Sequence, residues 1–444
     1  MTQEEAIRRE NRKLRAKEVK KMGRQKSFIC IDLKSFYASV ECVERGLDPF
    51  KTNLVVADPT RSQSTICLAI TPAMKKLGVK NRCRIHEIPA GIEYITAMPR
   101  MQLYIDYSAR IYSIYLRYIS KEDIHVYSID ECFMDVTNYL SLYHMTGKEM
   151  AVELMDAVMK ETGITATAGI GTNLYLAKVA MDIVAKHVED HIGILNEISY
   201  RQQLWDHRPL SDFWRIGSRT EKKLAGYGIH TMGDIAYTSV TSEEWLYKMF
   251  GIDAELLIDH AWGLESCDIH DIKNYHTEEH SLSNGQVLMR NYSFEEAAVV
   301  VREMTDVLVL DLVSKGLITG SVTLWIAYDH RYERPSSHGT VRLTSLTNSS
   351  STIMNEVDKL YQKITDRHTG IRRIEICANR VMPEGYLQYD LFTDPAAVEK
   401  EKNLQQAILD VKKRYGKNAI MRGANLLDCS TYRERNNQIG GHRA

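Results

Sequence analysis

Three carboxylates at two places in the chain are the residues best suited to do chemistry. Asp130 and Glu131 are adjacent and interrupt an apolar segment, residues 124–136, whose alternation predicts two short strands joined by a tight turn. Asp32 ends another apolar segment, residues 27–32, which predicts a buried strand. Converging carboxylates are costly to bury unless a cation compensates them, and oxygen ligands favour Mg²⁺ or Mn²⁺. An Asp-Glu pair alone would be read as a surface turn with two solvated acids, and it is Asp32 that favours a metal site.

The composition predicts a folded, water-soluble protein with several domains. The chain has 444 residues, which favours two to four domains, and 44% of them are hydrophobic. No apolar run approaches the roughly 20 residues needed to cross a bilayer, and the charged N-terminus does not resemble a signal peptide. Eight cysteines without paired spacing predict reduced thiols, a cytoplasmic location and no zinc site. A net charge of −1 leaves the partner open, because a local basic groove can coexist with an acidic site.

The elements that must position the acids follow one another in a regular order. Helical spacing predicts helices after each acid-bearing strand, and alternation predicts strands between them. This order indicates an α+β layer that brings Asp32 and the acid pair onto neighbouring strands. The predicted elements are a helix at 35–43, strands at 53–58 and 64–71, helices at 72–77 and 101–120, the acid hairpin, a helix at 147–161, a strand at 165–171 and a helix at 173–186.

The second half predicts a helical region followed by an independent small domain. Residues 188–265 favour short helices, and within them Gly217, Ser218, Arg219 and Thr220 precede a helix in a pattern like a helix-hairpin-helix. Backbone N–H groups at such a turn suit a DNA phosphate, although an ordinary αα-hairpin gives the same pattern. Polar residues 266–279 predict a linker. Residues 280–381 then follow a β-α-β-β-α-β order, with Ser293 and Glu296 as a capping box.

Both ends of the chain are polar. Residues 1–27 carry a basic excess, which we interpret as a solvated extension rather than a DNA-binding arm. After Pro383 the chain predicts a tail that contains a helix at 398–415. Within this tail, Gln388, Leu391 and Phe392 form an isolated apolar tip typical of a docking peptide.

Together these features resemble the Y-family translesion DNA polymerases, the ImpB/MucB/SamB family, and within it the UmuC-like branch of Gram-positive bacteria, plasmids and phages. Residues 31–41 and 128–131 carry the most specific part of the resemblance. It implies an α+β multidomain fold, a right-handed polymerase with a ferredoxin-like palm, small fingers, a helical thumb with a helix-hairpin-helix and a β-α-β-β-α-β little finger. The implied boundaries are an N-terminal extension at 1–27, palm at 28–45 and 100–187, fingers at 46–99, thumb at 188–265, linker at 266–279, little finger at 280–382 and C-terminal tail at 383–444.

The resemblance assigns roles to the acids. Asp32 and Asp130 would bridge two Mg²⁺ ions, for which Mn²⁺ can substitute. Glu131 would hold the ion that activates the primer 3′-hydroxyl, and the backbone carbonyl of Leu33 would contact the ion on the nucleotide side. The implied reaction is in-line attack of that hydroxyl on the α-phosphate of a dNTP.

It also implies contacts to the incoming nucleotide. Tyr37 matches the steric gate that excludes a 2′-hydroxyl, with Phe36 as its neighbour, while the alternative for Tyr37 is a core aromatic. Lys178 matches a lysine that reaches the triphosphate, against the alternative of an exposed helical lysine. The fingers depart from the family pattern of a Tyr and an Arg, so Thr71 and Lys75 are expected to supply a hydroxyl and a charge instead.

The implied function is error-prone, DNA-directed synthesis past lesions in DNA repair and SOS damage tolerance. Its partners would be primer-template DNA, dNTP, a sliding clamp (beta) bound through Gln388, Leu391 and Phe392, and RecA-like and UmuD-like proteins, with no membrane. Two alternatives stay open: a nucleotidyl cyclase-like palm enzyme, and a non-catalytic clamp- or recombinase-binding scaffold.

Overall fold

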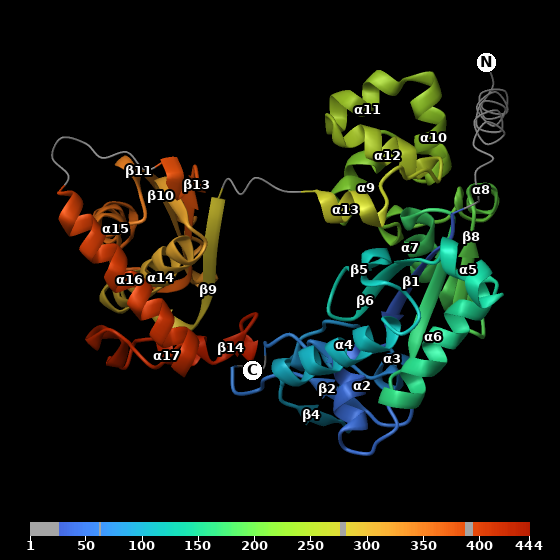
Figure 1. The fold of residues 1–444 in the computed structure, drawn as a ribbon, viewed down its shortest axis with the longest axis horizontal. Helices are drawn as coiled ribbons and strands as arrows, with labels where there is room; N and C mark the ends of the chain where they lie inside the picture. Colours follow the sequence, from blue (N-terminus) through green and yellow to red (C-terminus); the bar gives the residue numbers. More distant parts are fainter. Residues whose placement is uncertain (1–25, 62–63, 276–280, 387–393) are drawn as a thin grey trace. The chain divides into compact units, whose positions relative to one another are not determined.

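The chain divides into two compact units, residues 1–276 and 277–444, each with its own core (Figure 1). The computed structural model describes residues 26–61, 64–275, 281–386 and 394–444. Within these ranges no helix is long and apolar enough to cross a membrane. All eight cysteines are free, as the sequence predicted.

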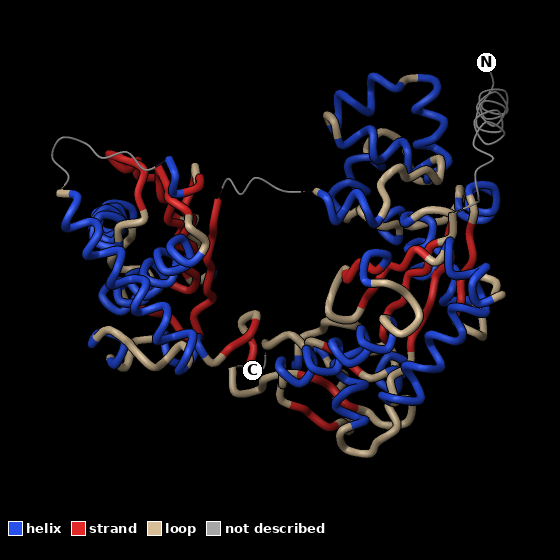
Figure 2. The backbone as a smooth tube through the Cα atoms, viewed as in Figure 1, coloured by secondary structure: helices blue, strands red, loops and turns tan. Residues whose placement is uncertain are grey.

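A five-stranded sheet is the centre of the first unit (Figure 2). The strand order is β5–β6–β1–β7–β8, in which β1 pairs antiparallel with both β6 and β7 while β7 and β8 are parallel. The apolar strand β1 is almost wholly buried because it lies in the middle of the sheet. The strands are β1 (Phe28–Leu33), β5 (Ile124–Val126), β6 (Glu131–Asp135), β7 (Ala166–Gly171) and β8 (Ile192–Leu195).

The predicted acid hairpin is confirmed as β5 and β6, but the predicted end of the palm is too early. Strand β8 adds a further strand to the sheet after residue 187. Its four residues follow a polar turn and lie next to helical segments, so alternation gave no strand signal there.

Helices α6 and α7 pack against this sheet, and a side chain caps the start of each. Helix α6 begins with a capping box between Thr146 and Glu149 and ends at Gly163, which is left-handed. Asn173 caps α7 by accepting a hydrogen bond from the Leu176 N–H at 2.8 Å. The helices are α2 (Phe36–Val43), α4 (Met101–Tyr115), α5 (Thr137–Tyr143), α6 (Gly147–Thr162) and α7 (Leu174–Asp182).

The segment between α2 and α4, where the sequence predicted the fingers, forms a small region with its own core. Its sheet has the order β3–β2–β4 and is shorter than the apolar segments suggested. Val55, Ile70 and Met74 belong to its core. The elements are β2 (Leu54–Val56), β3 (Ala69–Ile70), α3 (Pro72–Lys76) and β4 (Ile95–Ala97).

Short helices complete the first unit and correct the predicted linker. Residues 266–279 contain α13 (Ile269–Asn274), whose Ile269 is 2% exposed and packs with Phe28 and Phe133 of the sheet. Only two isoleucines, Ile269 and Ile272, face this core, which is too few for a periodic signal in a polar sequence. The helices before it are α8 (Glu197–Leu204), α9 (Ser218–Ala225), α10 (Met232–Thr241), α11 (Glu243–Phe250) and α12 (Asp253–Ala261).

The second unit confirms the predicted β-α-β-β-α-β order. Its sheet has the order β11–β10–β12–β9, and residues of both helices share one core with the strands. The Ser293–Glu296 capping box begins the first helix, as predicted. The elements are β9 (Ser281–Tyr292), α14 (Phe294–Ser314), β10 (Leu317–Tyr328), β11 (Ser337–Thr347), α15 (Ser350–Ile364) and β12 (Ile371–Asn379).

The predicted tail, residues 383–444, is largely part of this second unit. Helix α16 (Pro395–Tyr415) lies along α14, and α17 (Tyr432–Asn436) buries Tyr432. The sequence did not predict this packing because the contacts that hold the segment are polar. The main one is the set of hydrogen bonds to the buried Glu303 of α14. The predicted clamp-binding residues Gln388, Leu391 and Phe392 lie outside the described residues, as do residues 1–25.

Candidate active site

The sheet brings the three predicted acids together. Asp32 on β1 lies directly opposite Glu131, the first residue of β6. Asp130 precedes Glu131, and its carbonyl accepts a hydrogen bond from the Leu33 N–H at 2.9 Å. The end of strand β1 therefore lies against the β5–β6 turn, and this pairing brings the three acids together as the sequence predicted.

Alternation along the strands places these acids toward α7. Phe28, Cys30 and Asp32 share one face of β1, and Phe28 and Cys30 pack against residues of α7. Helix α7 carries Lys178, whose side chain is buried. Lys178 donates hydrogen bonds to Glu131 at 2.9 Å and to Asp182 at 3.1 Å.

The electrostatics of the site show that the acids lack a full complement of positive charge. Burial raises the pKa of Asp32 to about 7, and the charges of Asp130 and Glu131 add to the rise. Burial also raises the pKa of Glu131, against the opposing effects of Lys178 and of a hydrogen bond from Cys30. The Ser128 hydroxyl donates to Asp130 at 2.6 Å. A bound cation would relieve this repulsion.

The donor set fits Mg²⁺ or Mn²⁺, although the carboxylate oxygens do not form a closed ligand shell. Three carboxylates supply oxygen only, which these hard cations prefer. Glu131 faces Lys178 and Cys30, so it must exchange that contact to act as a ligand. Asp32, Asp130 and Glu131 would hold the ions, together with the Leu33 carbonyl.

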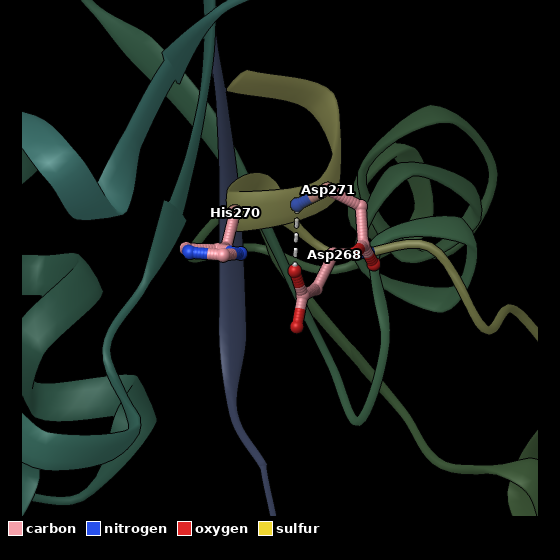
Figure 3. Close-up of side chains that lie close together, drawn as sticks. All are labelled: Asp268, His270 and Asp271. Carbon is pink, nitrogen blue, oxygen red and sulfur yellow. Dashed lines mark hydrogen bonds between the residues drawn. The ribbon is translucent and has the colours of Figure 1, made fainter. Parts of the chain in front are cut away.

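Among the described residues, the acids and histidine whose ligand atoms all lie within 4.8 Å of one another are Asp268, His270 and Asp271, and the three acids of the candidate site are not spaced this closely. This cluster is a helix cap (Figure 3). Asp268 accepts a hydrogen bond from the Asp271 N–H at 3.1 Å at the start of α13, and it pairs with Lys26 at 2.8 Å. Its geometry is therefore explained without a metal.

Tyr37 lies within electrostatic range of Asp130, whereas Phe36 belongs to the core. Phe36 is buried and Tyr37 is partly exposed. Burial raises the pKa of Tyr37, and the charge of Asp130 raises it further, which places the phenol near that acid. The Tyr37 ring stacks on Tyr104, with ring centroids 4.5 Å apart and planes at 17°.

Of the two residues between α2 and α4 that were predicted to contact phosphate, Lys75 lies near the acids and Thr71 does not face a ligand. Burial lowers the pKa of Lys75, and the charge of Asp32 opposes that effect, so its ammonium group lies within reach of the acid site. Thr71 corrects the prediction. Its buried hydroxyl donates to the Thr52 carbonyl at 2.8 Å and accepts from the Leu54 N–H at 3.2 Å, so it holds the start of α3 instead of facing a ligand.

Two further charged residues that were not predicted are Lys34, near the acids, and Glu41, on the helix that carries Tyr37. Burial and the charge of Lys75 lower the pKa of Lys34, which follows the acid by two positions. Glu41, on α2, is fully buried. Its signal in the sequence is a lone carboxylate within the apolar run of the helix that carries Tyr37.

The predicted hairpin in the helical region is present. Gly217 precedes α9, which begins at Ser218, and Ser218 and Arg219 are exposed while Thr220 is partly buried. The helix is followed by a turn at Gly228, whose φ is +78°, and by α10. The start of α9 is exposed at Gly217, where an added Cβ atom would meet no atom within 4 Å.

Comparisons with known proteins point the same way as the site. The model of the impB/mucB/samB family matches residues 31–182, and that of the impB/mucB/samB family C-terminal domain matches residues 279–391. Together the two matches cover more than half of the chain. The first contains all three acids, and the second contains the β-α-β-β-α-β unit.

Relatives are similar over nearly their whole length. A putative UV-damage repair protein, UvrX of Bacillus subtilis, is 29% identical over 422 residues, which are 95% of this chain and 98% of the relative. A DNA polymerase IV of the same organism is 29% identical over 95% of this chain and 100% of its own. A solved Y-family DNA polymerase chimera has a TM-score of 0.62 at 21% identity, over 80% of this chain and 99% of that chain. This structural likeness establishes the Y-family polymerase fold.

Proposed function

This chain belongs to the impB/mucB/samB family, and we propose that it is a DNA-directed DNA polymerase that copies damaged templates. The observation that carries the proposal is the register of β1 and β6, which sets Asp32 opposite Glu131 beside Asp130. A relative named DNA polymerase IV and one named a UV-damage repair protein support the substrate class and the setting.

The reaction is nucleotidyl transfer from a dNTP to a primer annealed to a template. The primer 3′-hydroxyl attacks the α-phosphate, a new P–O bond forms and pyrophosphate leaves. Two divalent cations held by Asp32, Asp130, Glu131 and the Leu33 carbonyl would stabilise the charge on the attacking and leaving oxygens. The protein's own residues bring these oxygen ligands together at one place, through the pairing of β1 with β6.

Other residues bind and select the nucleotide. The Tyr37 ring would lie under the sugar and exclude a 2′-hydroxyl. Lys75 and Lys34 would contact the triphosphate from the fingers side and the strand end, and both lie within electrostatic reach of the acids. Lys178 would exchange Glu131 for a phosphate oxygen when the cations bind, with Asp182 as its remaining partner.

The DNA would be held by the hairpin of the first unit. Gly217, Ser218, Arg219 and Thr220 present a helix start to a backbone phosphate. The small fingers favour an open site with weak discrimination, which suits error-prone synthesis past lesions in SOS damage tolerance. We also propose that the protein is cytoplasmic and works with a sliding clamp and with RecA-like and UmuD-like proteins. Primer extension across a defined lesion, with and without clamp and recombinase, tests these partners.

Primer extension with Mg²⁺ tests the activity. We expect the wild type to extend a primer and Asp130→Asn to lose at least about 10³-fold in rate, because the substitution removes one negative ligand without changing the size of the side chain. Asp156→Asn, at an exposed position of α6, is the matched control and should be unaffected. Formation of a cyclic nucleotide without a primer would favour the cyclase alternative. DNA or clamp binding without any turnover would favour the scaffold.

A further inference from the structure

Glu41 is a buried charge that the proposed chemistry does not use. Its side chain is 0% exposed. It lies four residues after Tyr37 on α2, so the two side chains share one side of that helix. A buried carboxylate is costly unless it is paired and fully hydrogen-bonded, so its partners indicate its purpose.

Three side chains satisfy this carboxylate completely. Arg100 donates through Nε to Oε1 at 2.9 Å and through Nη2 to Oε2 at 2.8 Å, which is a bidentate pair. The Tyr104 hydroxyl donates to Oε1 at 2.7 Å, and Arg45 donates to Oε2. Burial would raise the pKa of Glu41, but these hydrogen bonds outweigh it and hold the pKa below its usual value. The group therefore stays charged and fixed in place.

The partners of Glu41 stand where the chain enters and leaves the fingers. Arg45 follows α2, just before the fingers begin, and Arg100 is the residue before α4, where the chain returns to the palm. The Glu41 carboxylate thus links both connections, at Arg45 and at Arg100, to the helix that carries Tyr37. Neighbouring bonds of this kind restrict motion more than isolated surface pairs do.

Tyr104 passes this order on to Tyr37. Its ring covers one face of the Tyr37 ring at a centroid distance of 4.5 Å and an angle of 17°. Because the Tyr104 hydroxyl is fixed by Glu41 and the ring is fully buried, the ring cannot move away from Tyr37 without breaking a hydrogen bond to a charged acceptor. The stacked Tyr37 ring is held against it, within 17° of parallel.

We propose that Tyr104, held by Glu41 and Arg100, is a positioning residue that sets the plane of Tyr37 and so determines how strongly ribonucleotides are rejected. This inference rests on the proposed polymerase function. A steric gate discriminates by a single oxygen atom, so a ring free to move by about 1 Å would lose most of its selectivity.

The test measures kcat/KM for single incorporation of a dNTP and of the matching rNTP. Tyr104→Phe keeps the stacked ring and removes the hydrogen bond, and it should lower the dNTP/rNTP ratio by about 3-fold. Tyr104→Leu removes the ring and should lower the ratio by about 10-fold or more. In both variants the change should come from faster rNTP incorporation, with dNTP efficiency within about 3-fold of the wild type.

Tyr107→Phe is the matched control. Tyr107 lies on the same helix, α4, and donates to a glutamate, Glu44, at 2.6 Å, so its removal deletes an exposed bond of the same kind. We expect Tyr107→Phe to leave the ratio unchanged. A second check is the double variant Tyr37→Ala/Tyr104→Leu, which should be no less selective than Tyr37→Ala alone, because Tyr104 acts through the Tyr37 ring.

The outcomes separate the two proposals. Unchanged selectivity in Tyr104→Phe and Tyr104→Leu, equal loss in Tyr107→Phe, or additive losses in the double variant would overturn the positioning role while leaving the polymerase activity intact. Absence of any primer extension by the wild type would overturn the polymerase function and the positioning role with it.

Discussion

At the scale of single residues, the burial of the acids at the site lowers the free energy of unfolding at neutral pH. Asp32 is buried beside Asp130 and Glu131, and its pKa of about 7 lies far above the ordinary aspartate value of 3.8. The folded protein therefore holds a proton there between pH 4 and 7 that the unfolded chain releases. Stability falls as pH rises through this window and stays lower above it.

Asp32→Asn should remove this cost. Without divalent cations, we expect the variant to match the wild type near pH 4 and to exceed it by as much as about 4 kcal/mol at pH 8, measured by urea unfolding. Saturating Mg²⁺ should stabilise the wild type and not the variant, because the cation replaces the missing positive charge. Asp156→Asn is exposed and serves as the control. Equal stability of Asp32→Asn and wild type at pH 8 would contradict the assigned repulsion.

At the scale of elements, the close contact of β7 with α7 sets the position of Lys178. Two glycines of the strand, Gly169 and Gly171, face the helix, and a Cβ atom on either would overlap the backbone of α7 at Ala177. The small residues that predicted this strand thus have a steric reason. A Cβ atom added at either glycine would displace α7 and with it Lys178, which donates a hydrogen bond to Glu131.

Gly171→Ala should therefore lower both stability and activity. We expect a loss of about 1–3 kcal/mol in unfolding free energy, typical of overpacking, together with slower primer extension. Gly423→Ala is the matched control, because a side chain there would meet nothing within 4 Å and the backbone is not left-handed. Thermal unfolding and extension rates measure both effects. A Gly171→Ala protein as stable and as active as Gly423→Ala would show that α7 tolerates displacement.

The same scale shows what the sequence could and could not predict. Strands and helices with clear periodicity, and the pairing of Asp32 with the acid hairpin, follow from local patterns. Helix α13 and the role of Thr71 do not, because two isoleucines or one hydroxyl carry no periodic signal. Two of the three Glu41 partners, Arg100 and Tyr104, lie 59 and 63 positions away along the chain, so only the fold brings them to it.

At the scale of the whole molecule, residues 394–444 complete the second unit through a polar anchor. Glu303 of α14 is 3% exposed and accepts hydrogen bonds from Asn425, Ser430 and both the N–H and the hydroxyl of Thr431. Arg422 adds a bidentate ion pair to Asp306 one turn along the same helix. Composition alone predicts a solvated tail for these polar residues. Their hydrogen bonds to Glu303 and Asp306 instead attach the segment to α14 of the second unit.

Glu303→Ala should release this segment. The substitution leaves the four donors from Asn425, Ser430 and Thr431 without their acceptor, so we expect a loss of about 2–4 kcal/mol in the stability of the second unit and faster proteolysis between residues 416 and 444. Glu303→Gln keeps one acceptor oxygen, so its stability and protease resistance should lie between those of the wild type and Glu303→Ala. Glu399→Ala, exposed on α16, is the control and should resist protease like the wild type. Wild-type protease resistance in Glu303→Ala would mean that apolar contacts such as those of Tyr432 hold the segment without the buried carboxylate.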